Sequence, residues 1–366
     1  MALLINSVSI SMYGQEPHSQ PKTLEINAQA PDFRLIGTDD KIHNLSDYSS
    51  ARVLVVVFSC NHCPTAQAYQ DRLINICTTY SLKGVTLVVI SPNSSKSLNL
   101  WEQGWSDLGD ELEDMKIRAK DKGYNFPYLY DGGDQKVSIA YGPVATPHAF
   151  VFDRSRRLQY AGCIDESMEN GKAETLRNAI DAVLAGKKIE NPVTKVFGCS
   201  TKWAWKTAET NKLYKQWSEL PVTVENIDGA GIKELIRNKS EKLRLINVWA
   251  SWCGPCVMEF PDFVTIDRIY RSRNFEFISI NADKLSRKDN VLKFLQKNEA
   301  SNRNFIFSSD NNTELVEAVD PQWTGALPYT LMVEQGGNVI YRLQGPIDMV
   351  TMRKLIVNNR YIDGVK

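Results

Sequence analysis

Two pairs of cysteines, each pair separated by two residues, are the side chains of this sequence best suited to chemistry. The second pair lies in Trp252-Cys253-Gly254-Pro255-Cys256, after an apolar run typical of a strand and before a helix start. A free thiol has a pKa of about 8.5, but the N–H groups at a helix start favour the thiolate. We therefore predict that Cys253 attacks a disulfide and that Cys256, one turn further on, resolves the mixed disulfide. Pro255 suits a first helical turn, where N–H groups lack intrahelical partners.

This stretch resembles the thioredoxin superfamily. The pattern Trp-Cys-x-x-Cys followed by Glu259 and Pro261 is most similar to the TlpA/ResA-type thiol-disulfide reductases, and the resemblance covers nearly all of 222–360. Asn247 stands where thioredoxin carries a buried Asp, so the resemblance implies that Glu259 handles the proton. It also implies a cis-proline turn at Leu327 and Pro328 that shapes the substrate dock. Trp252 and Pro255 are expected to line the same site.

The first pair lies in Ser59-Cys60-Asn61-His62-Cys63-Pro64, between the apolar run 53–58 and a segment with helical spacing. This strand-then-helix context favours a redox reading of the pair. His62 directly precedes the second cysteine, and a protonated imidazole beside a thiolate stabilises the reduced form. The pair is therefore predicted to form an oxidising disulfide. A solvent-exposed His62 without effect is the alternative.

The region of about 27–200 resembles the peroxiredoxin-like branch of the AhpC/TSA family. The motifs that carry this resemblance are 58–64, 126–131, 140–142, Thr146-Pro147 and 198–203. A peroxiredoxin has Pro and Thr seven and three residues before its attacking cysteine, whereas this chain has Val56 and Cys60 before Cys63. The missing hydroxyl argues against fast peroxidase activity and makes Cys60 the better candidate nucleophile. The resemblance also implies that Thr146 and Pro147 line the site as a second cis-proline turn.

The amino-acid composition limits the number of domains and the classes of partner to be considered. The 366 residues are 43% hydrophobic and 23% charged, which is ordinary globular material for about two domains. The formal net charge is zero and no long basic run occurs, so nothing favours a nucleic-acid or anionic-membrane partner. No run reaches the roughly 20 apolar residues that span a bilayer. We expect no integral membrane segment.

The seven cysteines are an odd number in a long chain, which does not indicate a disulfide scaffold. A zinc site is the alternative interpretation of two cysteines separated by two residues. The pairs lie far apart and each precedes a helix, so we predict redox sites and no metal. Cys77, Cys163 and Cys199 are interpreted as plain buried thiols, although Cys199 could approach the first site.

The predicted fold class is α/β, with two tandem thioredoxin-like folds, each a central mixed β-sheet flanked by helices. We expect a tail or signal remnant over 1–26, a first domain over 27–190, a linker over 191–221 and a second domain over 222–366.

The leading functional hypothesis is a thiol-disulfide oxidoreductase, with an intramolecular electron relay from the second domain to the first. Two alternatives stay open: a thiol peroxidase recycled by the second domain, and a non-catalytic first domain that binds a client. We expect no cofactor beyond the redox-active disulfides Cys253–Cys256 and Cys60–Cys63. The expected partners are protein disulfides or dithiols and an upstream thiol reductant. The resemblance implies a cell-envelope, periplasmic or other extracytoplasmic location, and a cytoplasmic one is the alternative.

Overall fold

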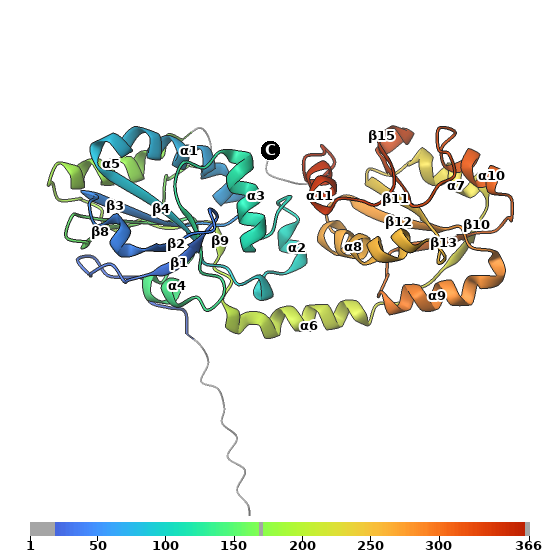
Figure 1. Cartoon of the computed structure of the whole chain (residues 1–366), viewed down its shortest axis with the longest axis horizontal. Helices are drawn as coiled ribbons and strands as arrows, with labels where there is room; N and C mark the ends of the chain where they lie inside the picture. Colours follow the sequence, from blue (N-terminus) through green and yellow to red (C-terminus); the bar gives the residue numbers. More distant parts are fainter. Residues whose placement is uncertain (1–18, 168–170, 363–366) are drawn as a thin grey trace, which may run out of the picture.

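The structure, a computed structural model, describes residues 19–167 and 171–362. It contains two β-sheets, each with its own helices, and the two halves lie side by side along the long axis (Figure 1). Helix α6 (Thr207–Ser218) runs along one side between them. The predicted fold class, two tandem domains built on mixed sheets flanked by helices, is confirmed.

The first sheet has seven strands in the order β2-β1-β5-β4-β3-β7-β8. Their bounds are β1 (Arg34–Gly37), β2 (Ile42–Asn44), β3 (Val53–Phe58), β4 (Val85–Ser91), β5 (Tyr128–Tyr130), β7 (His148–Phe152) and β8 (Leu158–Gly162). Strands β3, β4 and β5 are parallel, and β7 runs antiparallel to β3. All six residues of β3 are buried, as expected for a central strand covered on both faces.

Alternation along β3 sends its side chains into two cores. One core contains Val55 and side chains of three helices, α1 (Pro64–Tyr80), α3 (Leu112–Lys122) and α5 (Glu174–Leu184). The other core contains Val56 and side chains of α4 (Lys136–Tyr141). Strand β3 ends at Phe58, and the chain passes from that end of the sheet into α1.

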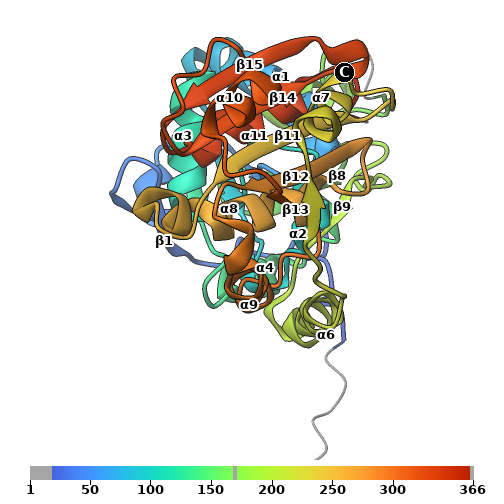
Figure 2. The same ribbon diagram turned by 90° about the vertical axis from the view of Figure 1, so that its right-hand side faces the viewer.

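The second sheet has six strands in the order β10-β13-β12-β11-β14-β15. Their bounds are β10 (Glu225–Ile227), β11 (Leu243–Trp249), β12 (Phe275–Asn281), β13 (Arg303–Phe307), β14 (Tyr329–Val333) and β15 (Val339–Gln344). The first four strands in sequence are parallel, and β14 and β15 are antiparallel. Helices α7 (Gly229–Arg237) and α10 (Asn312–Val319) pack on one face. Helices α8 (Gly254–Tyr270), α9 (Lys288–Lys297) and α11 (Met349–Val357) contribute to the cores of the other (Figure 2).

The segments predicted as tail and linker differ in part from the observed structure. Most of the predicted tail lies outside the described residues, but Leu24 and Ile26 pack on the core that contains Val56, and Leu24 N–H donates to the Tyr141 carbonyl. In the predicted linker, β9 (Cys199–Ser200) pairs with β6 (Ala145–Thr146). Trp203 is fully buried. The first domain therefore extends beyond 190, because these apolar and paired groups need its surface.

The two halves contact each other through helix α2 (Leu100–Gln103) and the loop after it. A Cβ on Gly104 would lie 2.8 Å from the carbonyl oxygen of Ile269, which explains why only glycine fits this approach. The carbonyl of Ser106 accepts hydrogen bonds from Tyr270 Oη over 3.3 Å and Arg353 Nη2 over 3.1 Å. The contact therefore involves the last turn of α8 and not its start.

Among the described residues, no helix has the length and apolar character required to cross a bilayer.

Candidate active sites

The second-domain site forms where strand β11 ends and helix α8 begins. Cys253 is the N-cap residue of α8, and its sulfur accepts a hydrogen bond from the Cys256 N–H over 3.3 Å. The two sulfurs are joined in a disulfide. Pro255 lies in the first turn, where its missing N–H costs nothing. The predicted placement of Cys253 at a helix start is confirmed, and that is the position that favours a thiolate once the bond is reduced.

Exposed apolar side chains lie around this site, while Cys253 itself is 5% exposed. The Leu327–Pro328 peptide bond is cis, as predicted. Trp252 beside the disulfide is 66% exposed and Met258 is 81% exposed. Large apolar side chains left in water are typical of a surface that docks a partner. The described part of the chain pairs no strand with 326–327.

Glu259 lies beneath the disulfide on the buried side of α8. It follows Cys256 by three residues, so the two side chains share a helix face. Its carboxylate accepts hydrogen bonds from Ile347 N–H over 2.9 Å and from Asn247 Nδ2 over 3.5 Å. Burial outweighs these bonds and raises the pKa of Glu259 to about 7. A carboxyl group with this pKa can both take and return a proton at neutral pH.

The first-domain site is built on the same plan but uses its cysteines differently. The residues after the two cis prolines, His148 and Tyr329, pair with Phe58 and Val248. Counting five residues on from each of these strand positions gives Cys63 in the first domain and Cys253 in the second. Cys63 is also the N-cap residue of its helix, α1. The second cysteine of the first pair therefore occupies the place of the first cysteine of the second pair.

The pKa shifts of the two cysteines agree with this placement. Hydrogen bonds from the Cys199 and Cys60 side chains, with the Ala66 N–H, lower the pKa of Cys63 well below its ordinary value despite burial. Burial raises the pKa of Cys60. Cys60 lies before the helix, where its sulfur is 3.1 Å from Thr146 Oγ1. This geometry opposes the expectation that Cys60 is the better nucleophile, so we reassign the attack to Cys63 as a proposal.

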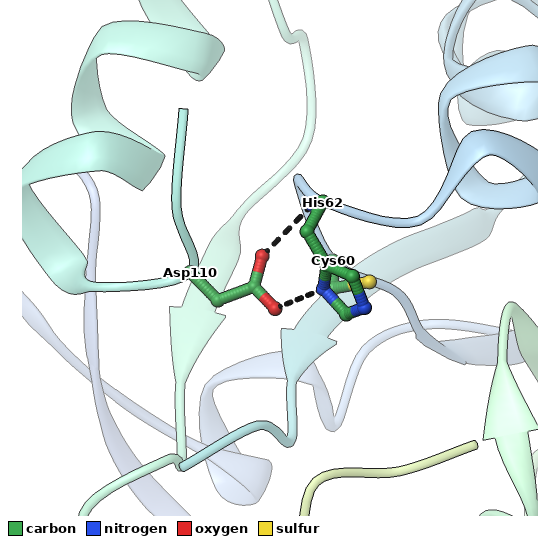
Figure 3. A group of neighbouring side chains, drawn as sticks. All are labelled: Cys60, His62 and Asp110. Atoms are coloured by element: carbon green, nitrogen blue, oxygen red, sulfur yellow. Dashed lines mark hydrogen bonds and ion pairs between the residues drawn. The ribbon is translucent and has the colours of Figure 1, made fainter. Parts of the chain in front are cut away.

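His62 forms a buried ion pair with Asp110, as Figure 3 shows. The distance from His62 Nδ1 to Asp110 Oδ2 is 2.6 Å, and His62 is 1% exposed, so the alternative of an exposed His62 is wrong. Burial by itself lowers the pKa of His62, but the Asp110 carboxylate outweighs it and the net shift is upward. Burial likewise raises the pKa of Asp110, and His62 reverses this to a net lowering. Both shifts favour the ionised form of the pair, in which the positive ring lies beside the cysteines.

Cys60, His62 and Asp110 are also residue types that bind metals, and one ligand atom of each lies within 4.8 Å of the others. Both oxygens of Asp110 are already engaged. Oδ1 accepts from the N–H groups of Asn61 and His62, and Oδ2 accepts from Asn93 Nδ2 and His62 Nδ1. A carboxylate saturated by N–H donors is better suited to holding the imidazole than to binding an ion.

Sequence reasoning missed two of these residues. Asp110 lies in the loop between α2 and α3 and belongs to no recognisable motif, and Asn93 lies after β4. Cys163 is buried as predicted, and Cys77 is half-buried, with its sulfur donating to the Asn125 carbonyl. Cys199 is different, because it packs against Cys60 and Cys63.

We expect Glu259→Gln to slow resolution of a mixed disulfide about 100-fold at pH 7, because an amide cannot accept the Cys256 proton. In the wild-type protein the rate of this step should rise as the pH increases through about 7, where Glu259 ionises. That inflection should vanish in the variant. Stopped-flow release of a chromogenic thiol measures it, with the exposed Glu241→Gln as the matched control. An unchanged pH profile in Glu259→Gln would exclude the carboxyl from proton transfer.

Asp110→Asn should destabilise the first domain by about 3–5 kcal/mol, because it removes one partner of a buried ion pair. The raised pKa of His62 means that the pair's stabilisation is present below pH 6.5 and is lost as the pH rises through the higher folded-state value. Urea unfolding between pH 6 and 9 should show this decline in the wild-type protein and a flatter dependence in the variant. Asp71→Asn, whose side chain is 81% exposed in the same domain, serves as the control. Equal pH dependence in both variants would contradict the ion pair.

Comparison with known proteins gives matches to both halves. Residues 26–161 match the AhpC/TSA family, and residues 235–354 match the Redoxin family. The chain is 30% identical over 116 residues to the thiol:disulfide interchange protein CycY of Rhizobium leguminosarum bv. viciae, covering 32% of this chain and 57% of that protein. It is 23% identical over 122 residues to the thiol-disulfide oxidoreductase ResA of Bacillus cereus, covering 33% and 65%.

The chain thus spans less than two thirds of the length of each of these curated relatives. Among solved structures, an uncharacterized conserved protein from Geobacillus kaustophilus is 34% identical, with a TM-score of 0.45, covering 52% of this chain and 97% of that one. The first half is thus similar to the AhpC/TSA family and the second to the Redoxin family, and the two mixed sheets, each with a cysteine at the start of the helix after a central strand, fit two tandem thioredoxin-like folds.

Proposed function

We propose that this protein is a thiol-disulfide oxidoreductase whose working centre is the Cys253–Cys256 dithiol. The observation that carries the proposal is the position of Cys253 at the N-cap of α8, bonded to Cys256 and beside an open apolar surface. Relatives named thiol-disulfide oxidoreductases support the class of reaction. Substrates are protein disulfides that lie along the Leu327–Pro328 turn in extended form, and an upstream thiol reductant restores the dithiol.

The reaction has two exchange steps. The Cys253 thiolate, stabilised by the Cys256 N–H and the start of α8, attacks one sulfur of the substrate and releases the other as a thiol. Glu259 accepts the proton of Cys256, whose thiolate then attacks Cys253 and releases the reduced substrate. The substrate gains two electrons, and the enzyme is left with the Cys253–Cys256 disulfide.

The first domain is proposed to exchange electrons with the second. In the observed arrangement the interdomain contacts of α8 involve its last turn, while Cys253 lies at its start. A helix of 17 residues is about 25 Å long, so Cys253 lies far along the helix from that contact. Transfer inside one chain therefore needs the domains to separate, and transfer between two chains does not. An extracytoplasmic location is proposed from the resemblance to the TlpA/ResA type.

The peroxidase alternative lacks support from the first site. The position of the peroxidatic threonine holds Cys60, and the Cys63 side chain has no exposed surface. A peroxide would meet neither the expected hydroxyl donor nor an accessible sulfur. The third alternative, a client-binding first domain, depends on the first-domain cysteines being inert.

We expect Cys253→Ser to lose more than 99% of the rate of insulin disulfide reduction with a dithiol reductant, because the attacking sulfur is gone. Cys256→Ser should accumulate a mixed disulfide with the substrate, visible by intact mass. The control is Cys163→Ser, which removes a buried thiol outside both sites. Retention of wild-type turnover by Cys253→Ser would contradict the proposal.

The relay is tested with two double variants mixed in solution. Fully reduced Cys60→Ser/Cys63→Ser is added to oxidised Cys253→Ser/Cys256→Ser, and the mixture is quenched with acid and alkylated over time. Free thiols should appear on the first-domain peptide of the second variant, at a rate proportional to the concentration of the first. A first-domain peptide that stays oxidised, both in this mixture and in reduced wild-type chains, would remove the relay.

A further inference from the structure

A third cysteine lies against the first site, on strand β9. Cys199 is paired with Thr146, the residue that precedes the first cis proline. Its backbone N–H donates to Cys63 Sγ over 3.3 Å, and Thr146 Oγ1 donates to its carbonyl over 3.4 Å. Cys60, Cys63 and Cys199 pack as one cluster. The interpretation of Cys199 as a plain buried thiol does not account for these contacts.

Strand β9 is held firmly in this place. Gly198 has a φ of +142°, and a Cβ there would lie 2.1 Å from the Thr146 carbonyl oxygen, so the backbone itself packs on the cis-proline turn. Downstream, the Lys202 N–H donates to Asn93 Oδ1 over 2.9 Å, and Trp203 is fully buried. The strand is a fixed wall of the site and not a loosely attached segment.

The two sites therefore differ in access. An extended peptide can dock on an exposed strand edge by adding a strand, with main-chain hydrogen bonds to that edge. In the first domain β9 already occupies that edge. Cys60 and Cys63 are 2% and 0% exposed, whereas Cys199 is partly exposed. Of the three clustered residues, Cys199 alone offers a partner protein more than a trace of surface.

We propose that Cys199 is a third redox cysteine, which forms a disulfide with Cys63 and transfers electrons between this buried site and an external dithiol. In this arrangement β9 acts as a built-in substrate strand, and its cysteine takes the place that a docked partner's cysteine would take. The proposal deepens the proposed function, because it names the route by which the first domain exchanges electrons.

The exchange balances with a dithiol as co-reactant, and the Cys253/Cys256 pair of this protein is one such dithiol. Its thiolate attacks the Cys199 sulfur of the Cys63–Cys199 disulfide, and Cys63 departs as a thiolate. The second thiol of the donor, after losing its proton, attacks the mixed disulfide and releases Cys199, which takes up that proton. The donor is oxidised to a disulfide and the first site gains two electrons. The low pKa of Cys63 makes it a good leaving group.

Trypsin digestion of the full-length protein distinguishes a Cys60–Cys63 disulfide from one that reaches Cys199, and the Cys60→Ser variant shows whether Cys63 is the partner of Cys199. Cys60 and Cys63 lie in one tryptic peptide, 53–72, and Cys199 lies in another, 196–202. A Cys60–Cys63 bond leaves 53–72 as a single peptide two mass units lighter, whereas a Cys63–Cys199 bond links the two peptides. The protein is equilibrated across glutathione redox buffers, quenched, alkylated and digested without reduction.

We expect the linked peptide in the wild-type protein, and in Cys60→Ser in at least half of the molecules at the oxidising end. Cys199→Ser should lose it, and Cys163→Ser should keep it. Absence of the linked peptide from folded Cys60→Ser would overturn the proposal, whether or not the wild-type protein forms it. Circular dichroism of each variant establishes that it is folded, and diamide oxidation of the wild-type protein gives a second reading that needs no substitution. The Cys253–Cys256 titration in the same samples reports separately on the proposed function.

Discussion

The start of a helix at the end of a central strand is the constraint on which both sites depend. The first N–H groups of a helix have no intrahelical partner, so they stabilise negative charge at the residue that precedes them. Cys63 and Cys253 occupy that residue before α1 and α8. The fully buried strands β3 and β11 determine where each helix begins, and the antiparallel strand beside each brings a cis proline opposite the sulfur.

A buried charge makes the first site dependent on the second domain. The His62–Asp110 pair is out of contact with water, so its attraction must offset a large desolvation cost. The Asp110 carboxylate can offset this cost only because its loop holds it against His62. The same loop carries Ser106, whose carbonyl accepts hydrogen bonds from Tyr270 and Arg353 of the second domain. Separation of the domains would therefore release the support of the loop that positions Asp110.

The two sites differ in what occupies the strand edge beside the cis proline. In the second domain the edge beside Leu327 is left open, and Trp252 extends into solvent. In the first domain the chain itself fills the edge with β9. An open edge suits varied extended partners, because main-chain hydrogen bonds do not depend on sequence. A filled edge leaves Cys199 as the exposed part of the cysteine cluster.

Much of the architecture could be predicted from sequence. The apolar runs that became β3 and β11 and the helices after them follow from local pattern, because burial on both faces demands continuous apolar residues, whereas both cis prolines were expected from the family resemblance. The short hairpin of β1 and β2 and the helices α2 and α10 were not predicted. They are short or mixed in polarity, so their stability comes from packing and not from local preference.

The role of each first-domain cysteine could not be read from spacing. By itself the sequence determined that each domain has a two-residue cysteine spacing after a buried strand, and it specified the residues of the Cys253–Cys256 site. Only the tertiary structure placed Cys63 at the N-cap of α1, brought Cys199 beside it across β6 and β9, and turned Asp110 onto His62. Those contacts join residues far apart in the chain, and long-range packing carries no signature in the local pattern from which helices and strands are predicted.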